Sequence, residues 1–225
     1  MKYIPSLLSD QPREISEQLE RIAGIDELNR IQFDIIDGLY ADNITITPAD
    51  FIQFDLSGFE VDVHLMTQEP IDGVHEIIDH RRSAPISAII GQVERMSSQQ
   101  HFLDEVKKQG WKPGLSLDLH TPVEAIDSDS WEELKMIQVM GISAGFQGQE
   151  LSFSSLEVVQ EIKRLIQAKQ LNIEIIFDGG VKPDNISPIA VAGAQAVTIG
   201  SGFWNSQDIG AQLGSYEAAL ESPDS

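Results

Sequence analysis

Two short apolar stretches of the sequence each carry a carboxylate side chain, one within the stretch and one directly after it. Asp34 stands within the stretch from 31 to 36, and Asp178 follows the stretch from 173 to 177 and precedes two glycines. Burying a carboxylate among apolar residues is costly unless it is protonated, paired or bound to a metal. Each aspartate could therefore be a strand-end cap or half of a buried ion pair. Two such groups flanking a bound molecule could instead remove a proton from one face of a carbon and return a proton to the other.

His64 lies in a third apolar stretch, between two aliphatic residues. A lone histidine in a strand is more often a hydrogen-bonded core residue than a ligand, but beside two carboxylates it suits Zn²⁺, Mn²⁺ or Fe²⁺. Asp62 alternates with His64 and is a candidate to support it from the same face. His120 follows another apolar stretch and is a weaker candidate. The remaining histidines, His75, His80 and His101, are interpreted as surface residues.

Glycine-containing segments follow three consecutive apolar stretches in the second half of the chain. They lie at 145–149, 179–180 and 200–202. Backbone N–H groups in such loops bind anions, phosphate above all. One such loop alone would be interpreted as an ordinary turn, but three in succession indicate a phosphate site. The net charge is −21, from 15 Lys and Arg against 36 Asp and Glu, so diffuse positive potential cannot supply that binding.

The elements that must position these residues alternate along the chain. Apolar, β-branched runs predict eight strands near residues 2–7, 31–36, 60–65, 85–90, 113–118, 136–142, 173–177 and 195–200. Helical periodicity predicts helices near 13–23, 71–81, 97–108, 155–170 and 207–220. This alternation predicts a parallel sheet covered by helices. Eight units favour one (β/α)8 TIM barrel domain over residues 1–225, with 221–225 fraying, and a doubly wound open sheet is the alternative.

A barrel of this kind carries its active-site groups at the carboxyl ends of its strands. The candidate carboxylates, the histidine and the glycine loops all fall at predicted strand ends. In that fold the second and seventh strands would place Asp34 and Asp178 across the mouth of the barrel from each other. A phosphate site after the seventh and eighth strands recurs in such barrels.

Composition excludes several classes of function. The chain has no cysteine, which excludes disulfides, thiolate metal sites and cysteine nucleophiles. Its acidity argues against nucleic-acid and anionic-membrane partners. No apolar run has the length of a membrane span, and the first residues turn polar too soon for a signal peptide. We therefore expect a cytoplasmic protein, and a homo-oligomer is a reasonable default.

An ordered set of motifs covers nearly the whole chain and resembles the ribulose-phosphate 3-epimerases. The motifs are PSLLSD (5–10), FDIIDGLYADNITITP (33–48), DVHLM (62–66), GFQGQ (145–149), FDGGV (177–181) and AGAQAVTIGSGFW (192–204). The resemblance implies a TIM barrel of the ribulose-phosphate-binding type. It also implies the interconversion of D-ribulose 5-phosphate and D-xylulose 5-phosphate, a small sugar-phosphate substrate. One divalent ion, Zn, Mn, Fe or Co, would stabilise an enediolate.

The resemblance also implies roles for individual residues. Asp34 matches the proton acceptor and Asp178 the proton donor, and both match metal ligands together with His64. The matches to substrate- and phosphate-binding positions are Ser6, His64, Gly145, Phe146, Gln147, Gly148, Gly179, Gly180, Gly200 and Ser201. Met66 and Met140 match methionines that line the family's active site.

Several positions depart from the family pattern. Gln32 stands where the family has a histidine metal ligand, and its neutral amide would be a weak ligand. Other replaced positions are Ile36, Gln92 or Gly91, Asp118–Leu119 and Ala144. These departures leave two alternatives open, a 3-epimerase of a hexulose 6-phosphate and a non-catalytic phosphosugar-binding barrel. A decarboxylase or aldolase-like relative is disfavoured, because the stretch 62–66 lacks the lysine of that chemistry.

Overall fold

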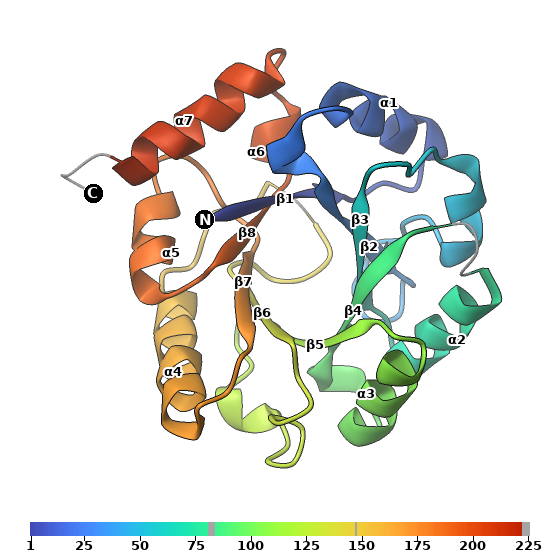
Figure 1. The fold of residues 1–225 in the computed structure, drawn as a ribbon, viewed down its shortest axis with the longest axis vertical. Coiled ribbons are helices and arrows are strands. Elements are labelled where there is room, and N and C mark those ends of the chain that lie inside the picture. Colours follow the sequence, from blue (N-terminus) through green and yellow to red (C-terminus); the bar gives the residue numbers. More distant parts are fainter. Residues whose placement is uncertain (81–83, 147, 222–225) are drawn as a thin grey trace.

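The sheet is a closed barrel of eight parallel strands that pair in sequence order, the last with the first. The computed structural model describes residues 1–80, 84–146 and 148–221. Figure 1 shows the strands as a central ring, with the helices packed around its outside. The expected (β/α)8 TIM barrel is therefore confirmed, and the open doubly wound sheet is excluded.

The eight strands lie where the apolar runs predicted them, with ends that differ by one or two residues. They are β1 (Lys2–Leu7), β2 (Arg30–Ile36), β3 (Glu60–Met66), β4 (Ile86–Gln92), β5 (Lys112–Leu117), β6 (Met136–Met140), β7 (Glu174–Asp178) and β8 (Ala196–Ile199). The largest differences are at β4, which ends two residues later than expected, and at β6, which ends two residues earlier.

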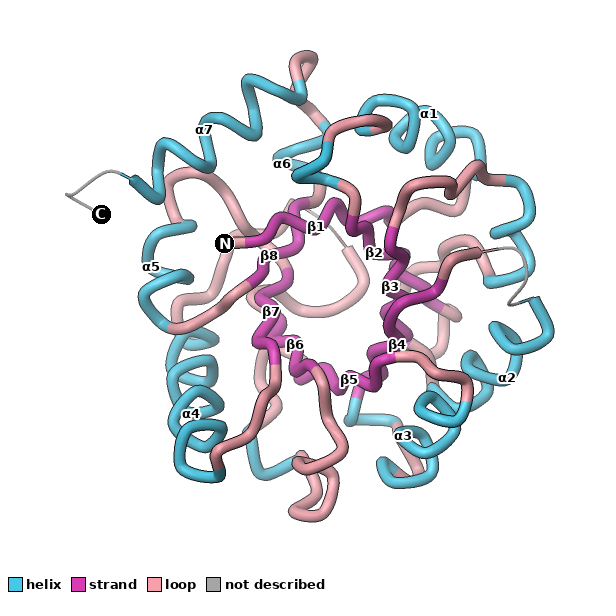
Figure 2. The backbone as a smooth tube through the Cα atoms, in the orientation of Figure 1, coloured by secondary structure: helices cyan, strands magenta, loops and turns pink. Residues whose placement is uncertain are grey.

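The helices agree less completely with the sequence expectation. They are α1 (Pro12–Ile22), α2 (Pro70–His80), α3 (Gln99–Lys108), α4 (Ser154–Lys169), α5 (Ile186–Ala192), α6 (Ser201–Trp204) and α7 (Ile209–Glu221). The two short helices, α5 and α6, were not predicted. Among the described residues, four 3₁₀ turns also lie between these elements, at Asp26–Leu28, Pro48–Gln53, Val93–Arg95 and Val123–Ala125. Figure 2 distinguishes the helices in cyan and the strands in magenta from the connecting loops in pink. Residues 222–225 of the predicted frayed tail lie outside the described residues.

A 3₁₀ turn replaces an α-helix after β2, and aromatic packing explains how the strand stays covered. Phe33 faces outward from β2, and its ring centroid lies 4.8 Å from that of Phe51 in the turn Pro48–Gln53. The Phe33 ring also stacks on Phe54, at a centroid distance of 5.8 Å. This short segment therefore buries the outer face of the strand that a helix would otherwise cover.

Alternation along β2 decides which side chains face the barrel interior. Ile31, Phe33 and Ile35 belong to the large core between the sheet and its covering elements. The residues between them, Gln32 and Asp34, are 0% and 3% exposed and point the other way, into the barrel. The strand therefore gives its apolar face to the core and its polar face to the barrel axis.

Asp62 lies inside the barrel at its amino-terminal end and does not support His64. Its carboxylate accepts a hydrogen bond from Arg30 Nε at 2.7 Å, and Arg30 Nη1 reaches Glu174 at 2.7 Å. These residues lie in the first halves of their strands, whereas His64 lies near the end of β3. The expectation for Asp62 was wrong, because a fully buried carboxylate took the nearest guanidinium as its partner. His120 is exposed.

The described parts of the chain, 1–80, 84–146 and 148–221, include no helix that is both long and apolar enough to span a membrane.

Candidate active site

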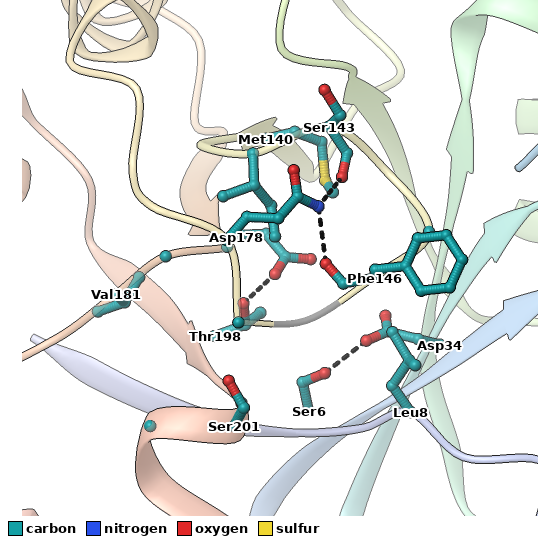
Figure 3. Close-up of a pocket in the computed structure, with 18 of the residues that line it drawn as sticks. Ser6, Leu8, Asp34, Met140, Ser143, Phe146, Asp178, Val181, Thr198 and Ser201 are labelled. Carbon is teal, nitrogen blue, oxygen red and sulfur yellow. Dashed lines mark hydrogen bonds between the residues drawn. The ribbon is translucent and has the colours of Figure 1, made fainter. Parts of the chain in front are cut away.

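A cavity of about 270 Å³ opens at the carboxyl ends of the strands. Its lining brings together most of the residues singled out in the sequence, including Ser6, Asp34, Met66, Met140, Gly145, Phe146, Gly148, Asp178, Gly179, Gly180, Gly200 and Ser201. Figure 3 shows Asp34 and Asp178 projecting into this space from different strands. The strand ends of β1, β2 and β6 to β8 therefore converge on one site, as the barrel fold requires.

Two aspartates and one histidine form a buried cluster at the floor of this cavity, which we term the triad (Asp34, His64 and Asp178). Strand register places Asp34 directly opposite His64 on the neighbouring strand. His64 Nδ1 lies 3.1 Å from Asp34 Oδ1 and 3.6 Å from Asp178 Oδ2. The carboxylates are 3% and 7% exposed, and the imidazole is fully buried. The strands thus bring together three titratable groups that are far apart in the sequence.

Two buried glutamines contact the triad, and we term them the amide pair (Gln32 and Gln138). Gln32 Nε2 donates to Asp34 Oδ1 at 2.8 Å and to Asp178 Oδ2 at 3.0 Å. Gln138 Nε2 donates to the same Asp178 oxygen at 2.6 Å and lies 3.0 Å from His64 Nδ1. Gln32 therefore presents a donor nitrogen, and not the ligand oxygen expected from the sequence, because the carboxylates beside it are acceptors.

Hydroxyl groups hold the outer oxygens of both carboxylates. Ser6 Oγ donates to Asp34 Oδ2 at 2.5 Å, and Thr198 Oγ1 donates to Asp178 Oδ1. Figure 3 marks both bonds as dashed lines. Each carboxylate is therefore anchored on two sides, which fixes the direction in which its oxygens face the cavity.

Sequence reasoning missed Gln138 and Thr198 as site residues. Gln138 alternates with Met136 and Met140 in β6, and Thr198 interrupts the apolar strand β8. The available signal was the same one that exposed Asp34, a polar side chain on the inward face of an otherwise apolar strand.

Burial and neighbouring charges shift the pKa values of Asp178 and His64. Burial, followed by the nearby charge of Asp34, raises the pKa of Asp178 to about 6, against the opposing effects of His64, Thr198 and Gln32. Burial opposes protonation of His64 most strongly, yet the hydrogen bond and charge of Asp34, with the charge of Asp178, raise the pKa of the imidazole overall. Asp178 therefore keeps its proton to a higher pH than an ordinary carboxyl group, which suits a general acid.

Glycine loops after β6, β7 and β8 form the wall of the cavity. Gly179 and Gly180 have φ angles of 97° and 71°, which other residues rarely adopt. A Cβ on Gly180 would stand 2.9 Å from the backbone of Leu151 in the preceding loop. The two loops therefore pack against each other at a distance that only glycine permits, and leave backbone groups facing the cavity.

Two side-chain amides hold the loop after β6 in place. Asn43 Nδ2 donates to the carbonyl oxygen of Gly145 at 2.7 Å. Gln149 Nε2 donates to the carbonyl oxygens of Ser143 and Phe146, each at 2.8 Å. Phe146 is 52% exposed at the rim. Gln147, expected to contact phosphate, lies outside the described residues.

The triad has the donor set of a metal site. One ligand atom from each of Asp34, His64 and Asp178 lies within 4.8 Å of the others, and all three residues are buried. A nitrogen and two carboxylates suit several divalent transition metals.

The other departures from the family pattern lie in β2 and on the β4–β5 side of the mouth. Ile36 is 2% exposed. The amide of Gln92 lies 3.2 Å from Glu94 Oε2 and 3.0 Å from Ser116 O.

Asp118 Oδ1 accepts hydrogen bonds from the backbone of Leu119 and Ala144. The Tyr40 hydroxyl donates to Glu94 at 2.9 Å and to Asp118 at 3.5 Å. This side of the mouth therefore carries its own polar network, separate from the triad.

Comparisons with known proteins agree on one family. A model described as the ribulose-phosphate 3 epimerase family matches residues 2–204. The ribulose-phosphate 3-epimerase of Buchnera aphidicola subsp. Acyrthosiphon pisum is 32% identical over 206 residues, covering 89% of this chain and 86% of the relative. That of Escherichia coli strain K12 is 31% identical over 208 residues, covering 91% and 89%.

Solved structures with much lower identity share the fold. Phosphoribosyl anthranilate isomerase from Thermus thermophilus superposes with a TM-score of 0.61 at 12% identity, covering 98% of both chains. A 3-hexulose-6-phosphate synthase gives a TM-score of 0.63 at 12% identity, covering 97% of this chain and 98% of that chain. At this identity the similarity shows the barrel architecture alone.

Proposed function

Because the chain belongs to the ribulose-phosphate 3-epimerase family, whose members are isomerases, we propose that it interconverts D-ribulose 5-phosphate and D-xylulose 5-phosphate as a single-domain enzyme. The observation that supports this most directly is the pair of carboxylates, Asp34 and Asp178, anchored on different strands and facing one cavity. Epimerisation needs one group to take a proton from a carbon and another to return a proton to its opposite face.

In the proposed reaction Asp34 accepts the proton from C3 of the sugar, and the bonding electrons pass into an enediolate. Asp178 then delivers its proton to the other face of the same carbon. Burial and Asp34 raise the pKa of Asp178 to about 6, so without a bound ion this carboxyl keeps its proton to a higher pH than an ordinary aspartate does. Ser6 and Thr198 hold the two carboxylates in position, so neither has to reorient during the transfer.

The phosphate group of the substrate would bind to the glycine loops. Gly179, Gly180 and Gly200 line the same cavity as the carboxylates, and Ser201 adds a hydroxyl group beside them. Backbone N–H groups bind a phosphate without a surrounding positive field, which suits a chain of net charge −21. Gly145, Phe146 and Gly148 would bound the phosphate from the loop after β6, and Met66 and Met140 would line the apolar wall.

The triad is the proposed site of one divalent metal ion. Asp34, His64 and Asp178 fit such an ion in number, donor type and proximity, and Zn²⁺, Mn²⁺, Fe²⁺ and Co²⁺ all accept this donor set. When bound, the ion would supply positive charge beside the developing enediolate.

A hexulose 6-phosphate is the second candidate substrate. The observation that favours it is the polar network of Tyr40, Glu94 and Asp118 at the β4–β5 side of the mouth. That network lies outside the lining of the cavity, where it would offer hydrogen-bonding groups to a polyol that extends beyond the cavity. A hexulose would leave the roles of the two aspartates unchanged.

An epimerase assay with matched variants tests the proposal. D-ribulose 5-phosphate and a hexulose 6-phosphate are each supplied to purified protein with Mn²⁺, with Zn²⁺ and with EDTA. We expect Asp34→Asn and Asp178→Asn each to lower kcat by about 10³-fold, because each removes one proton-transfer group. Asp129→Asn, at an exposed position in a connecting segment, is the control and should retain full activity.

Unchanged turnover in either aspartate variant would refute the proposed mechanism. A higher kcat/KM for the hexulose than for the pentulose would select the second substrate. Absence of turnover with either sugar under all three conditions, together with tight binding of the sugar phosphate, would show a non-catalytic binding barrel.

A further inference from the structure

The amide pair makes contacts that a cation would otherwise make. A divalent ion in the triad would bring the two negatively charged carboxylates together and would bind the imidazole nitrogen. Gln32 Nε2 already joins Asp34 to Asp178, at 2.8 Å and 3.0 Å. Gln138 Nε2 donates to Asp178 Oδ2 at 2.6 Å and lies 3.0 Å from His64 Nδ1. Together the two amides contact all three members of the triad.

Both amides donate and neither presents its oxygen to a partner. The carbonyl oxygens of Gln32 and Gln138 are buried and have no hydrogen-bond partner among the described residues, and both side chains are 0% exposed. Leaving a buried carbonyl without a partner is costly. The N–H contacts to the triad therefore determine the orientation of both amides, even at the expense of their oxygens.

These N–H groups compete with an ion for the same ligand atoms. A metal ion needs to approach a carboxylate oxygen or an imidazole nitrogen to about 2.0–2.2 Å. Asp178 Oδ2 already accepts from both amides, and Asp34 Oδ1 accepts from Gln32. Their N–H bonds point at carboxylate oxygens that an ion would use, so these contacts oppose the binding of an ion.

We propose that Gln32 and Gln138 act as a built-in substitute for the ion, holding the triad in its working geometry without metal and weakening metal binding. The inference goes beyond the proposed function, because it concerns how the triad is held together and not which sugar is turned over. Gln32 and Gln138 are positioning residues in this arrangement.

Metal binding to the EDTA-treated, full-length protein tests the proposal without any substrate. Mn²⁺ affinity is measured by electron paramagnetic resonance for wild type, Gln32→Leu and Gln138→Leu. We expect each variant to bind Mn²⁺ about tenfold more tightly than wild type, because the ion no longer has to displace a hydrogen bond from the amide, and one such bond is worth about a factor of ten. Gln92→Leu is the matched control, since Gln92 is an equally buried glutamine whose amide lies beside Glu94 and Ser116.

Melting temperature provides a second measurement on the same samples. Without ion, the two leucine variants should melt about 4 °C or more below wild type, because the carboxylates lose the group that joins them. Saturating Mn²⁺ should reverse this loss in the variants and change the wild-type value little. Gln32→His, which places an imidazole nitrogen at that position, should give the largest Mn²⁺-dependent increase in melting temperature.

A third measurement uses only the wild-type protein. The side-chain amide hydrogens of the two glutamines should be protected from exchange with solvent in the ion-free state and lose protection when Zn²⁺ is added. Equal or weaker Mn²⁺ binding in both leucine variants, or amide hydrogens unprotected without ion, would overturn the proposal. An inactive wild-type enzyme with these binding results would refute the proposed function and leave this inference standing.

Discussion

Asp34 and Asp178 are chemically identical side chains that the barrel places in different surroundings. Ser6 and Gln32 donate to Asp34, whereas Thr198 and both amides of the pair donate to Asp178. Differences of this kind are how one fold obtains both an acid and a base from the same residue type. The sequence alone identified both aspartates as candidate site residues, because a carboxylate is unusual in an apolar strand. Gln138 was missed, since a single neutral amide disturbs an apolar pattern much less.

The raised pKa of Asp178 predicts how stability changes with pH. Burial and Asp34 raise it from the ordinary 3.8 to about 6, so between these values the native state binds more protons than the unfolded state. The contribution of Asp178 to stability is therefore complete below pH 4 and is lost as the pH rises through 6. In EDTA, Asp178→Asn should gain stability over wild type by on the order of 1–3 kcal/mol between pH 4 and 7.

Urea unfolding of both proteins at several pH values measures this difference. Subtracting the wild-type value from that of the variant removes the titration of the other carboxylates. A difference that stays constant from pH 4 to pH 7 would show that burial does not raise the proton affinity of Asp178.

The strands were predicted well because most are nearly continuous apolar runs, which are typical of a parallel sheet covered by helices. The helices were predicted only where one face was polar. α5 has the sequence ISPIAVA, which is apolar on all sides and seven residues long, so it lacks the periodic stripe that identifies a surface helix. The 3₁₀ turn Pro48–Gln53 was missed because its covering role depends on contacts with Phe33 that the local sequence does not reveal.

The loops after β6 and β7 predict a specific effect at Gly180. Alanine there must adopt a φ of 71° and place its Cβ 2.9 Å from the Leu151 backbone. We expect Gly180→Ala to destabilise the fold by about 2 kcal/mol or more and to raise KM, because the phosphate loop must shift. Steady-state kinetics and thermal unfolding measure the two effects.

Gly24→Ala isolates the cost of the backbone angle alone. Gly24 has a φ of 80°, and a Cβ there meets no heavy atom within 4 Å. This variant should lose about 1 kcal/mol of stability and keep the wild-type KM. Equal losses and equal KM values for the two alanine variants would show that the contact with Leu151 has no influence on the loop.

At the scale of the whole molecule, the two ends of the barrel carry different polar networks. The carboxyl end holds the triad, and the amino end holds Arg30 between Asp62 and Glu174, with Lys2 at its edge. Polar groups at the amino ends of barrel strands serve stability, whereas those at the carboxyl ends serve chemistry. The sequence could not distinguish Asp62 from Asp34, because both alternate with other polar residues and only the register of the strands separates the two ends.

Removing the guanidinium at the amino end should affect stability and leave the chemistry intact. Arg30→Met leaves the buried Asp62 carboxylate without its partner and should cost about 3–5 kcal/mol. Lys2→Met breaks an ion pair whose lysine side chain is 67% exposed and should cost less than about 1 kcal/mol. Chemical denaturation measures both, and kcat should be unchanged in the folded fraction. A kcat loss in Arg30→Met matching that of the aspartate variants would show that the two ends are coupled.

Closure of the barrel has a consequence for the order of events in refolding. Lys2 pairs with Ala196, so the last seam of the sheet joins segments from opposite ends of the chain, and such distant pairings form slowly. Ser6 on one side of that seam and Thr198 on the other hold the two carboxylates. A chain that has formed most of its secondary structure but has not yet closed this seam therefore lacks anchored carboxylates. After dilution from denaturant, the return of turnover should lag behind the return of the circular dichroism signal.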